Sequence, residues 1–399
     1  MLLYTCSAAN PTPSSVFAQI NSASSSSSIV IHPYKSSLHM NHLYVCILAG
    51  GSGERFWPMS RKSLPKHLLR IVAEATLVEL TVKRLEGLVP QDHIFILTNA
   101  AQLEATRSAL PFVPEEQIIA EPAKRDTAPA CALGTALIRS IDPEGIVALL
   151  PADALVKDAA TFRRQFEEAA RIARERDAFL TFGIPPRYPA TGFGYLEMGQ
   201  PVDVTAFTAE RPIASDFRHV GRFVEKPNQE KAQSYVDAGN FLWNAGMFVW
   251  KAETFEKEAR RHAPALAKFI AEMPADRAAQ AEYLDRTFPM LPKISVDYAI
   301  MEKAESVICC RAEFDWDDVG AWTALPDHLG SDENGNTVQG SAALHESSNN
   351  IVISRNRMVA LCGINDLVVV ETDDAILICP RDRAQDVKSL MPLLPKDLT

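Results

Sequence analysis

Four cations follow a glycine cluster early in the chain, and together these residues could hold a polyphosphate. The set comprises Gly50, Gly51, Gly53, Arg55, Arg61, Lys62 and Lys66. Glycine lets the backbone turn sharply and lets amide groups approach an anion with no Cβ in the way. The apolar run 43–49 comes directly before the cluster and predicts a strand buried on both faces of a parallel sheet. We therefore expect the strand, the turn and the cations to form the cationic half of a phosphate site.

The two commonest phosphate loops do not match this stretch. A P-loop needs a lysine directly after its last glycine, and none stands at that spacing. The dinucleotide fingerprint G-x-G-x-x-G begins at Gly51 and Gly53, but Phe56 occupies the third glycine position. A plain NAD-binding protein is therefore disfavoured, whereas a glycine turn with solvated cations remains an alternative.

The longer string is more specific than its glycines. Residues 50–61 read G-G-S-G-E-R-F-W-P-M-S-R, and Pro65-Lys66 follows. This string resembles the signature of sugar-nucleotide pyrophosphorylases, and its W-P-x-S-R part is similar to the mannose-1-phosphate guanylyltransferase branch. The resemblance implies that the loop amides bind a nucleotide. It also implies that Arg55 and Lys66 neutralise the triphosphate and the departing pyrophosphate.

Two acidic positions are candidate metal ligands. The run 145–153 predicts a second buried strand that ends in Asp153, at the sheet edge where ligands of parallel sheets bind. Its P-A-D resembles the family's P-A-D-H, whose Asp binds Mg²⁺, although Ala154 replaces the histidine. The run 314–322, F-D-W-D-D-V-G-A-W, resembles the family's second Mg²⁺ segment, and Asp318 takes the ligand position. The competing carboxylates are Asp315 and Asp317, and a solvated acidic turn is the alternative.

A third segment, at 121–130, reads E-P-A-K-R-D-T-A-P-A. Asp126 or Thr127 can cap the helix that follows, which is the purely structural interpretation. The segment also resembles the family motif E-P-x-G-R-N-T-A-P-A. The nucleotide-binding residues that this implies, besides the loop glycines, are Glu121, Arg125, Asp126 and Thr127. Lys124 and Asp126 depart from the motif, so the base preference stays open.

Sugar contacts are implied by four later segments. T-G-F-G-Y contains Gly192, F-V-E-K-P contains Glu225 and Lys226, F-L-W-N-A-G-M-F contains Asn244, and S-V-D-Y-A-I-M-E-K contains Asp297. The resemblance implies that Lys226 meets the sugar phosphate and that the others contact the sugar. From the residues alone, a hairpin, an exposed strand edge, core aromatics and a helix cap remain alternatives.

The composition excludes some classes of protein. The 399 residues carry a formal net charge of −10 and a pI of about 5.5, which argues against a nucleic-acid-binding surface. No apolar run approaches the roughly 18 to 20 residues of a membrane span. The seven cysteines are scattered without a C-x-x-C pair, which favours free thiols in a reducing compartment. We therefore expect a cytoplasmic enzyme, and a homodimer is among the assemblies that the sequence allows.

Strand and helix patterns alternate after the glycine cluster. They predict helices at 76–88, 101–110 and 161–176 and strands at 93–98 and 179–184. The fold class is therefore α/β, and the resemblance specifies a Rossmann-like nucleotidyltransferase domain with a mixed, mostly parallel sheet at 43–328. Residues 329–399 alternate polar turns and short apolar runs, which predicts a small all-β domain, similar to the family's β-helix, with a final helix.

Residues 1–42 differ in composition from the rest of the chain. They are rich in serine and contain no acidic residue, and they lack the features of a secretory or transit peptide. We interpret them as a disordered leader or as a misassigned start, with the working start near Met40. At the other end, the resemblance stops before the cupin domain of longer relatives, which implies a monofunctional enzyme.

The resemblance implies that the chain makes GDP-mannose and pyrophosphate from mannose-1-phosphate and GTP with Mg²⁺. Two alternatives stay open. One is a related enzyme that uses another nucleotide or sugar. The other is a catalytically silent subunit that binds a sugar nucleotide, which the presence of Arg55, Lys66 and Lys226 disfavours. The hypothesis requires Asp153, Lys226 and Asp318 to converge on Arg55 in space.

Overall fold

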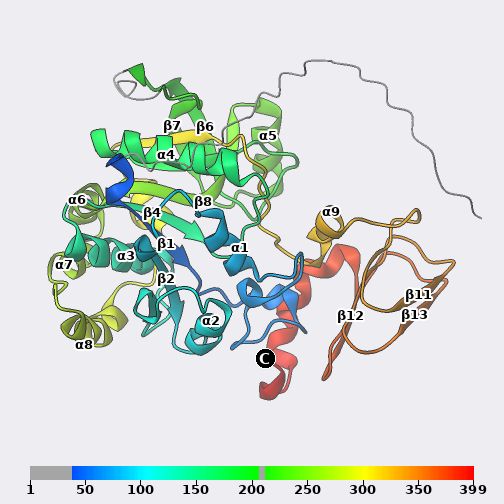
Figure 1. The fold of residues 1–399 in the computed structure, drawn as a ribbon. Helices are drawn as coiled ribbons and strands as arrows, with labels where there is room; N and C mark the ends of the chain where they lie inside the picture. The colour runs from blue at the N-terminus through cyan, green and yellow to red at the C-terminus, as the bar shows by residue number, and fades with distance from the viewer. Residues whose placement is uncertain (1–37, 206–211) are drawn as a thin grey trace, which may run out of the picture. The chain divides into compact units, whose positions relative to one another are not determined.

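A nine-stranded sheet organises the protein. The computed structural model describes residues 38–205 and 212–399, and all of these belong to one compact unit. The strand order is β3-β2-β1-β4-β8-β5-β9-β7-β6 (Figure 1). The bounds are β1 Leu43–Leu48, β2 Ile94–Asn99, β3 Ile118–Glu121, β4 Ile146–Pro151, β5 Phe179–Ile184, β6 Tyr195–Pro201, β7 Phe217–Val224, β8 Phe241–Lys251 and β9 Val307–Arg311. Only β7 and β8 run against the others, which confirms the predicted mixed, mostly parallel sheet.

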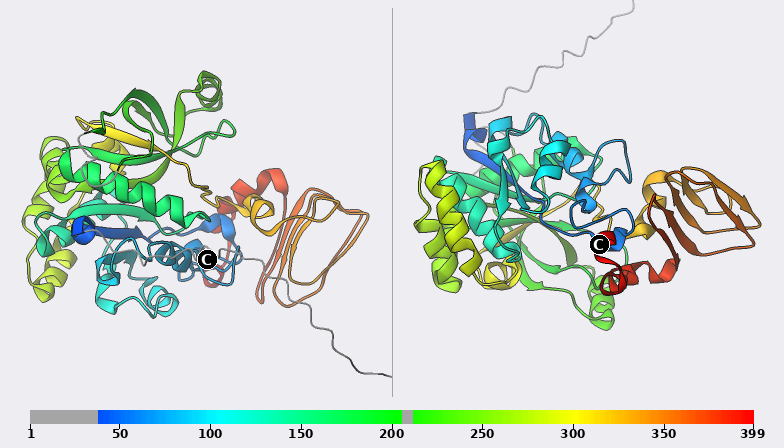
Figure 2. Two further views of the ribbon diagram at one scale, coloured as in Figure 1. Left: turned by 45° about the horizontal axis from the view of Figure 1, so that its top comes forward. Right: turned by 90° about the horizontal axis from the view of Figure 1, so that it is seen from below.

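Helices cover both faces of this sheet (Figure 2). Alternate residues of β1 show why: Leu43, Val45 and Ile47 belong to one apolar core, and Tyr44 and Cys46 belong to another. The first core includes α1 (Leu77–Arg84) and α4 (Ala159–Glu175). The second includes α3 (Thr127–Ile141), α6 (Ala252–His262), α7 (Pro264–Ala271) and α8 (Arg277–Thr287). The remaining helices are α2 (Leu103–Ala109), α5 (Gln229–Ala238) and α9 (Pro326–Leu329).

The strand order creates a switch point between β1 and β4. From β1 the chain moves to β2 and β3 on one side, and β4 then pairs with the other side of β1. The two strands end side by side, because Leu48 is in register with Pro151. Ligands of open α/β sheets bind at such a point. The glycine cluster and Asp153 therefore emerge next to each other.

Local signals explain where the predicted helices begin. The first starts at Leu77 because Thr76 accepts a hydrogen bond from the Glu79 amide while the Glu79 carboxylate accepts one from the Thr76 amide. The helix predicted at 161–176 begins two residues earlier, because the Asp158 side chain accepts a hydrogen bond from the amide of Thr161. The predicted strand 179–184 is confirmed without change.

The predicted C-terminal β region is a stack of short parallel strands. Its strands are β10 Thr337–Gln339, β11 Ala342–His345, β12 Ile351–Ser354, β13 Val359–Cys362, β14 Leu367–Glu371 and β15 Ile376–Pro380. Each turn of chain pairs in parallel with the turn before it, and β15 closes the stack in the antiparallel direction. Inside the stack Asn350 donates to the side-chain oxygen of Asn336 and to the carbonyl oxygen of Ile364. This arrangement is β-helix-like, as expected.

The chain then leaves the stack as a 3₁₀ helix, Arg381–Leu393, where a final helix was expected. We call residues 381–399 the C-terminal segment. A third apolar core joins this segment to the glycine-cluster region, since it contains Phe56, Trp322, Ala384 and Val387. The division into 43–328 and 329–399 stays a prediction, and a shared core crosses it.

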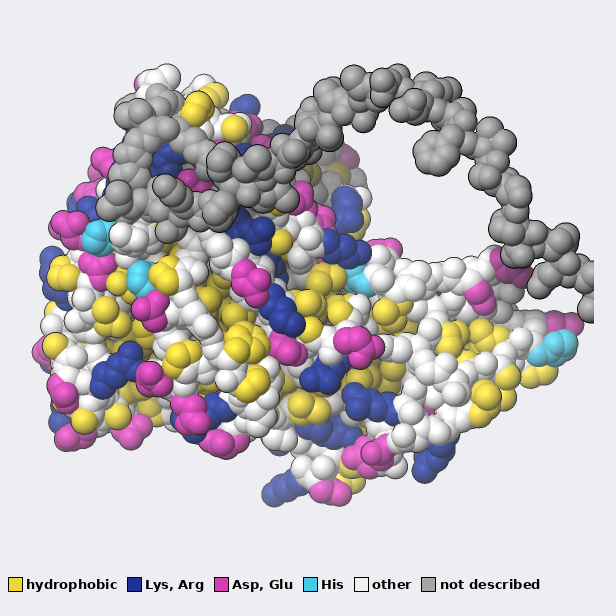
Figure 3. Space-filling view, in the orientation of Figure 1, with side chains coloured by type: hydrophobic (Ala, Val, Ile, Leu, Met, Phe, Trp, Pro, Cys, Tyr) yellow, Lys and Arg dark blue, Asp and Glu magenta, His cyan; other side chains and the backbone are white. Residues whose placement is uncertain are grey.

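Most of the expected leader, residues 1–37, lies outside the described residues. Its last residues, 38–42, form a turn of 3₁₀ helix, and the Met40 side chain is buried in the first core. His42 Nδ1 lies 2.7 Å from a carboxylate oxygen of Asp142. In the part of the chain that the structure describes, no helix has both the length and the apolar character to cross a membrane. Acidic and basic side chains are interspersed over the face shown in Figure 3.

Candidate active site

A cavity of about 590 Å³ opens beside the ends of β1 and β4. Eleven of the sixteen predicted site residues line it: Gly53, Arg55, Lys66, Thr127, Asp153, Gly192, Glu225, Lys226, Asn244, Asp297 and Asp318. The convergence that the sequence hypothesis required is therefore observed.

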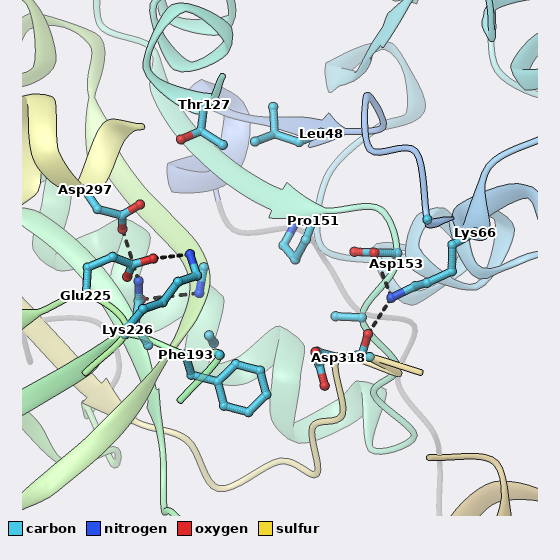
Figure 4. Close-up of a pocket in the computed structure, with 18 of the residues that line it drawn as sticks. Leu48, Lys66, Thr127, Pro151, Asp153, Phe193, Glu225, Lys226, Asp297 and Asp318 are labelled. Carbon is cyan, nitrogen blue, oxygen red and sulfur yellow. Dashed lines mark hydrogen bonds and ion pairs between the residues drawn. The ribbon is translucent and has the colours of Figure 1, made fainter. Parts of the chain in front are cut away.

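Charged side chains form two groups on opposite sides of this cavity (Figure 4). The Lys66 group consists of Lys66, Asp153 and Asp318, and the Lys226 group consists of Glu225, Lys226 and Asp297. Pro151, at the end of β4, is drawn between them. Each group combines a cation with two carboxylates.

Lys66 connects the two acidic loops of its own group. Its Nζ lies 2.7 Å from Oδ2 of Asp153 and also donates a hydrogen bond to the main-chain carbonyl of Asp318. Gly53 makes room for it: its φ is +62°, and a Cβ there would lie 2.6 Å from the backbone nitrogen of Lys66. Only glycine combines that backbone conformation with so close an approach. The glycine turn therefore packs directly against the lysine that holds the two acidic loops.

The two carboxylates of the Lys66 group differ in their proton affinity. Burial raises the pKa of Asp318 to about 6, and the charges of Asp317 and Asp153 add to this effect while Lys66 opposes it. Burial also raises the pKa of Asp153, but the charge and hydrogen bond of Lys66 outweigh it and keep that pKa below its usual value. An added cation near Asp318 would oppose this increase of its pKa.

The three neighbouring carboxylates of the acidic run have different partners. Asp315 accepts hydrogen bonds from the amides of Lys157 and Asp158 at 2.7 to 3.0 Å. Asp317 accepts one from the Val319 amide at 2.6 Å and lies 2.9 Å from Nε2 of His328. Of the three, Asp318 alone lines the 590 Å³ cavity.

The residue after Asp318 is in a strained conformation. Val319 has a φ of +45°, which is rare for a β-branched residue, and its side chain is fully buried. Strain of this kind persists only where the surroundings over-determine it. The buried Val319 side chain, and the hydrogen bond that the Val319 amide donates to Asp317, hold this turn. The Asp318 carboxylate is therefore fixed at the cavity.

Asn244 is held tightly within the opposite side of the cavity. Its side-chain oxygen accepts hydrogen bonds from Thr181 Oγ1 at 3.0 Å and from the Gly246 amide at 3.3 Å, and its Nδ2 donates to Asp297 at 3.3 Å. Asp297 is the first residue of a π-helical turn, Asp297–Met301, and whether it caps this turn or orients the sugar stays a prediction. Burial raises the pKa of Asp297 to about 6, with a further contribution from the charge of Glu225.

Lys226 closes the same group through an ion pair with Glu225. Burial lowers the pKa of Lys226, but the bond to Glu225 and the charge of Asp297 outweigh this effect and raise it. Its φ is +46°, so Lys226 itself has a strained backbone conformation. The lysine therefore stays charged, and its side chain, 62% exposed, is open to a ligand.

Some residues that line the cavity are not among the sixteen predicted site residues. Gly194 is the tighter of two neighbouring glycines, because a Cβ there would lie 2.6 Å from Oε2 of Glu225, whereas a Cβ on Gly192 would meet open space. The T-G-F-G spacing was a signal for it. Phe193 and Trp316 line the cavity and pack edge to face at 5.4 Å. Further lining residues include Leu48, Ser52, Glu54, Phe56, Pro151, Val296 and Lys388.

Five predicted nucleotide contacts do not line the cavity: Gly50, Gly51, Glu121, Arg125 and Asp126. The carbonyl oxygens of the two glycines accept hydrogen bonds from the side-chain amides of Asn99 and Gln102. A Cβ on either glycine would meet nothing within 4 Å. In the direction in which a side chain would point, therefore, these two glycines face open space.

The other three lie around the start of α3. Asp126 caps this helix through a bond from the Thr127 amide, as the structural interpretation predicted. Arg125 donates a hydrogen bond to the carbonyl of Pro289. Burial raises the pKa of Glu121 to about 8, so this side chain is protonated at neutral pH. Their role in nucleotide binding stays a prediction.

Two of the four cations expected in one row point elsewhere. Arg61 donates to the carboxylate of Asp374 at 2.9 Å, and Lys62 donates to Oγ1 of Thr399 at 3.1 Å. Beside them, the indole N–H of Trp57 donates to the carbonyl of Leu398 at 2.8 Å. These contacts fasten the loop of residues 50–66, which we call the signature loop, to the β stack and to the C-terminal segment. Of the four cations, Arg55 and Lys66 remain at the cavity.

The site chemistry fits a hard divalent cation. Asp153 and Asp318 offer carboxylate oxygens, which such ions prefer. Residues 38–205 and 212–399 contain no group of three or more His, Cys, Asp or Glu side chains placed to hold a metal ion. A metal at this pair would therefore take its remaining ligands from substrate phosphates and water, as Mg²⁺ commonly does.

Comparison with known proteins gives two family matches. The nucleotidyl transferase family matches residues 44–334, and the mannose-phosphate isomerase/GMP-like β-helix domain family matches residues 341–394. The mannose-1-phosphate guanylyltransferase of Salmonella montevideo is 34% identical over 349 residues, covering 86% of this chain and 72% of that protein. The alginate biosynthesis protein AlgA of Pseudomonas aeruginosa is 34% identical over 356 residues, covering 86% and 70%.

Solved structures agree with these matches. A crystal structure from Thermus thermophilus, described as a mannose-1-phosphate geranyltransferase, has a TM-score of 0.77 and 31% identity. The match covers 88% of this chain and 99% of that one. A structure described as a Helicobacter pylori mannose-6-phosphate isomerase shares the fold, with a TM-score of 0.52 and 23% identity over 69% of this chain and 99% of that one. The fold class predicted from the sequence is confirmed.

Proposed function

Because this chain belongs to the mannose-1-phosphate guanylyltransferase family of nucleotidyl transferases, we propose that it makes GDP-mannose and pyrophosphate from GTP and mannose-1-phosphate. One observation carries the proposal. The Lys66 group and the Lys226 group lie on opposite sides of one cavity, so that a triphosphate and a sugar phosphate can be held facing each other.

The reaction needs positioning more than proton transfer. A phosphate oxygen of mannose-1-phosphate attacks the α-phosphorus of GTP in line, and the bond between the α-phosphorus and the oxygen that leads to the β-phosphorus breaks. The nucleophile is already an anion, so no general base is required. The difficulty is to bring two polyanions together, and fixed cations reduce that cost.

On the sugar side, Lys226 would hold the attacking phosphate. Glu225 and Asp297 would accept hydrogen bonds from the sugar hydroxyls, Asn244 would donate one to them, and Gly192 gives close access. Support comes from the bonds that fix Asn244 on both sides and from the exposed side chain of Lys226.

On the nucleotide side, Arg55 would contact the triphosphate. Its Nε is buried and has no hydrogen-bond partner in the described part of the chain, which a phosphate oxygen would supply. Lys66 would fix the two acidic loops and add a positive charge. The amides of Gly50, Gly51 and Gly53, together with Thr127, would bind the rest of the nucleotide.

Nucleotidyl transferases of this family use a divalent metal ion, and we propose Mg²⁺ held by Asp153 and Asp318. When bound, the ion would neutralise negative charge on the substrate phosphates. The protein residues orient it: Lys66 sets the distance between the two loops, and the strained turn at Val319 fixes Asp318.

Base selection is the finest part of the proposal. Glu121, Arg125 and Asp126 are the proposed nucleotide contacts outside the cavity. A carboxylate at Asp126 can accept hydrogen bonds from the guanine N1 and N2 donors, which is compatible with GTP.

Purified protein with Mg²⁺, mannose-1-phosphate and each nucleoside triphosphate in turn tests the function. We expect pyrophosphate release to be fastest with GTP. A preference for dTTP or ATP would overturn the base assignment. Absence of turnover with all of them would favour a silent subunit that binds sugar nucleotides.

Two further properties belong to the same proposal. We propose a cytoplasmic location, because the six cysteines that the structure describes are all free thiols, as in a reducing compartment. We also propose a homodimer, for which Ile376 and Ile378, exposed side by side on β15, offer an apolar contact. Light scattering of the purified protein would show a monomer mass if the second proposal is wrong.

A further inference from the structure

The C-terminal segment places a lysine at the cavity. Lys388 is one of its lining residues, although it lies far along the chain from the signature loop. Its helix is of the 3₁₀ type, in which side chains three residues apart lie on the same face. Ala384 and Val387 form the buried face of this helix and pack into the core that contains Phe56. The next position along, Lys388, therefore lies beside the glycine loop and faces the cavity.

A second residue of the segment supports this orientation. Gln385 lies three residues before Lys388, on the same face, and lines an adjoining cavity of about 680 Å³. That cavity shares Arg55 and Asp318 with the first one. The face that carries Gln385 and Lys388 is thus turned toward the phosphate side of the site, in agreement with the packing of the other face.

The segment is fastened to the loop that it faces. Trp57 donates to the carbonyl of Leu398, Lys62 donates to Thr399, and the neighbouring Arg61 is paired with Asp374 at the end of the β stack. Phe56, next to Arg55, is fully buried in the same core as Val387. Lys388 and Arg55 are therefore each one residue away from a side chain anchored in one shared core.

The charges near the triphosphate position leave room for another cation. Lys66 already pairs with Asp153 and with the carbonyl of Asp318, so its charge is largely committed. Lys388, in contrast, has no ion-pair partner in the described part of the chain, and its side chain is exposed. A nucleoside triphosphate carries about four negative charges, most of them on its β- and γ-phosphates, which attract such a free ammonium group.

We propose that Lys388 binds the β- and γ-phosphates of the nucleotide and then holds the pyrophosphate that leaves. The C-terminal segment is then part of the active site and does more than cap the β stack. This inference rests on the proposed function, because it assumes that a triphosphate occupies the cavity.

Steady-state kinetics of Lys388→Met test the proposal. We expect the KM for GTP, and the KM for pyrophosphate in the reverse direction, to rise about tenfold, because a hydrogen bond to a charged group is lost. The KM for mannose-1-phosphate should stay within about twofold of the wild type. Lys388→Arg should restore most of the GTP affinity. The matched control is Lys396→Met, on an exposed lysine of the same segment that does not line the cavity, and it should behave as the wild type.

Two kinetic outcomes would overturn the proposal. One is an unchanged KM for GTP and for pyrophosphate in Lys388→Met. The other is an equal rise of all three KM values together with a lower Tm, since a merely structural lysine would act in that way.

A second measurement does not depend on turnover. The intact protein is acetylated with a limiting amount of acetic anhydride, with and without inorganic tripolyphosphate, and the modified lysines are quantified by mass spectrometry. Tripolyphosphate should slow the acetylation of Lys388 several-fold and leave Lys396 unaffected. Equal acetylation of Lys388 in both samples would refute the inference. Failure of the wild type to turn over any nucleotide would refute the proposed function instead, so the two failures are distinguishable.

Discussion

The contact between Lys66 and Asp153 is the most quantifiable interaction at the site. Its Nζ–Oδ2 distance is 2.7 Å, and the side chains are 8% and 44% exposed. Replacing Lys66 with Met removes the charge but keeps an apolar stem of similar length. The variant would leave Asp153 and Asp318 close together without the cation that connects their loops.

The size of the effect follows from distance and exposure. At an effective dielectric constant near 20, two unit charges at 2.7 Å attract by about 6 kcal/mol. The cost of burying Lys66 and the solvent around the half-exposed Asp153 reduce this to a net coupling of about 1–2 kcal/mol. Lys66→Met alone should lower the free energy of unfolding by more, about 2–3 kcal/mol, because it leaves a carboxylate without its partner.

A double-mutant cycle measures the coupling directly. The cycle uses Lys66→Met, Asp153→Asn and the double variant, with urea unfolding followed by tryptophan fluorescence and by circular dichroism to check that the transitions coincide. The exposed pair Lys257 and Asp177, 2.9 Å apart with side chains 44% and 55% exposed, is the control and should couple more weakly.

Additivity would refute this account of the site. The account is refuted if the losses of unfolding free energy in the two single variants add up to the loss in the double variant within about 0.5 kcal/mol. In that case the lysine does not hold the carboxylate, and other contacts set the distance between the two acidic loops.

Four other outcomes are expected. Asp318→Asn should lower pyrophosphate release at least about 100-fold with little change in Tm. Asp317→Asn, which replaces the carboxylate oxygen beside Nε2 of His328 with an uncharged amide group, should mainly lower Tm. Gly53→Ala should lower the free energy of unfolding by about 1–2 kcal/mol and should also weaken GTP binding, because φ is positive at this position and the new Cβ would clash with Lys66. A variant with the stability and the GTP affinity of the wild type would contradict the close approach of Gly53 and Lys66. Burial raises the pKa of Glu121 from 4.5 to about 8, so the contribution of this side chain to the stability of the fold falls as the pH rises between these values. The glutamine of Glu121→Gln does not titrate, so the difference in Tm between this variant and the wild type should grow in favour of the variant from pH 5 to pH 8. Scanning calorimetry measures this difference. Chelation of divalent ions should stop turnover, and added Mg²⁺ should restore it; full activity with chelator would exclude the proposed metal role.

The sequence predicted those parts of the site that depend on local patterns. The run 43–49 forms a buried strand because it is continuously apolar, and the loop that follows must lie at the carboxyl edge of the sheet. Asp153 follows a second such strand, so its meeting with Lys66 follows from topology. Residues that directly follow two parallel strands come close together when those strands are neighbours in the sheet, as β1 and β4 are.

Other features depend on partners that no local pattern reveals. Arg61 and Lys62 looked equivalent to Arg55 and Lys66, but their partners lie more than 300 residues later in the chain. The acidic run offered chemically identical carboxylates, and backbone amides decided which of them remained free. Lys388 occurs in a charged stretch that resembles any solvated helix, and only the packing of its buried face directs it to the cavity.

The contact between Arg61 and Asp374 has a consequence for how the protein matures. The two residues are separated by 313 positions. During synthesis at about 5–20 residues per second, the signature loop is made at least about fifteen seconds before its anchor leaves the ribosome. In that interval Phe56 and Trp57 lack the part of their core that comes from Ile351 to Val387. The two aromatic side chains therefore lack their complete core until synthesis ends, and the cavity that Phe56 and Lys388 line is completed only at the final stage of folding.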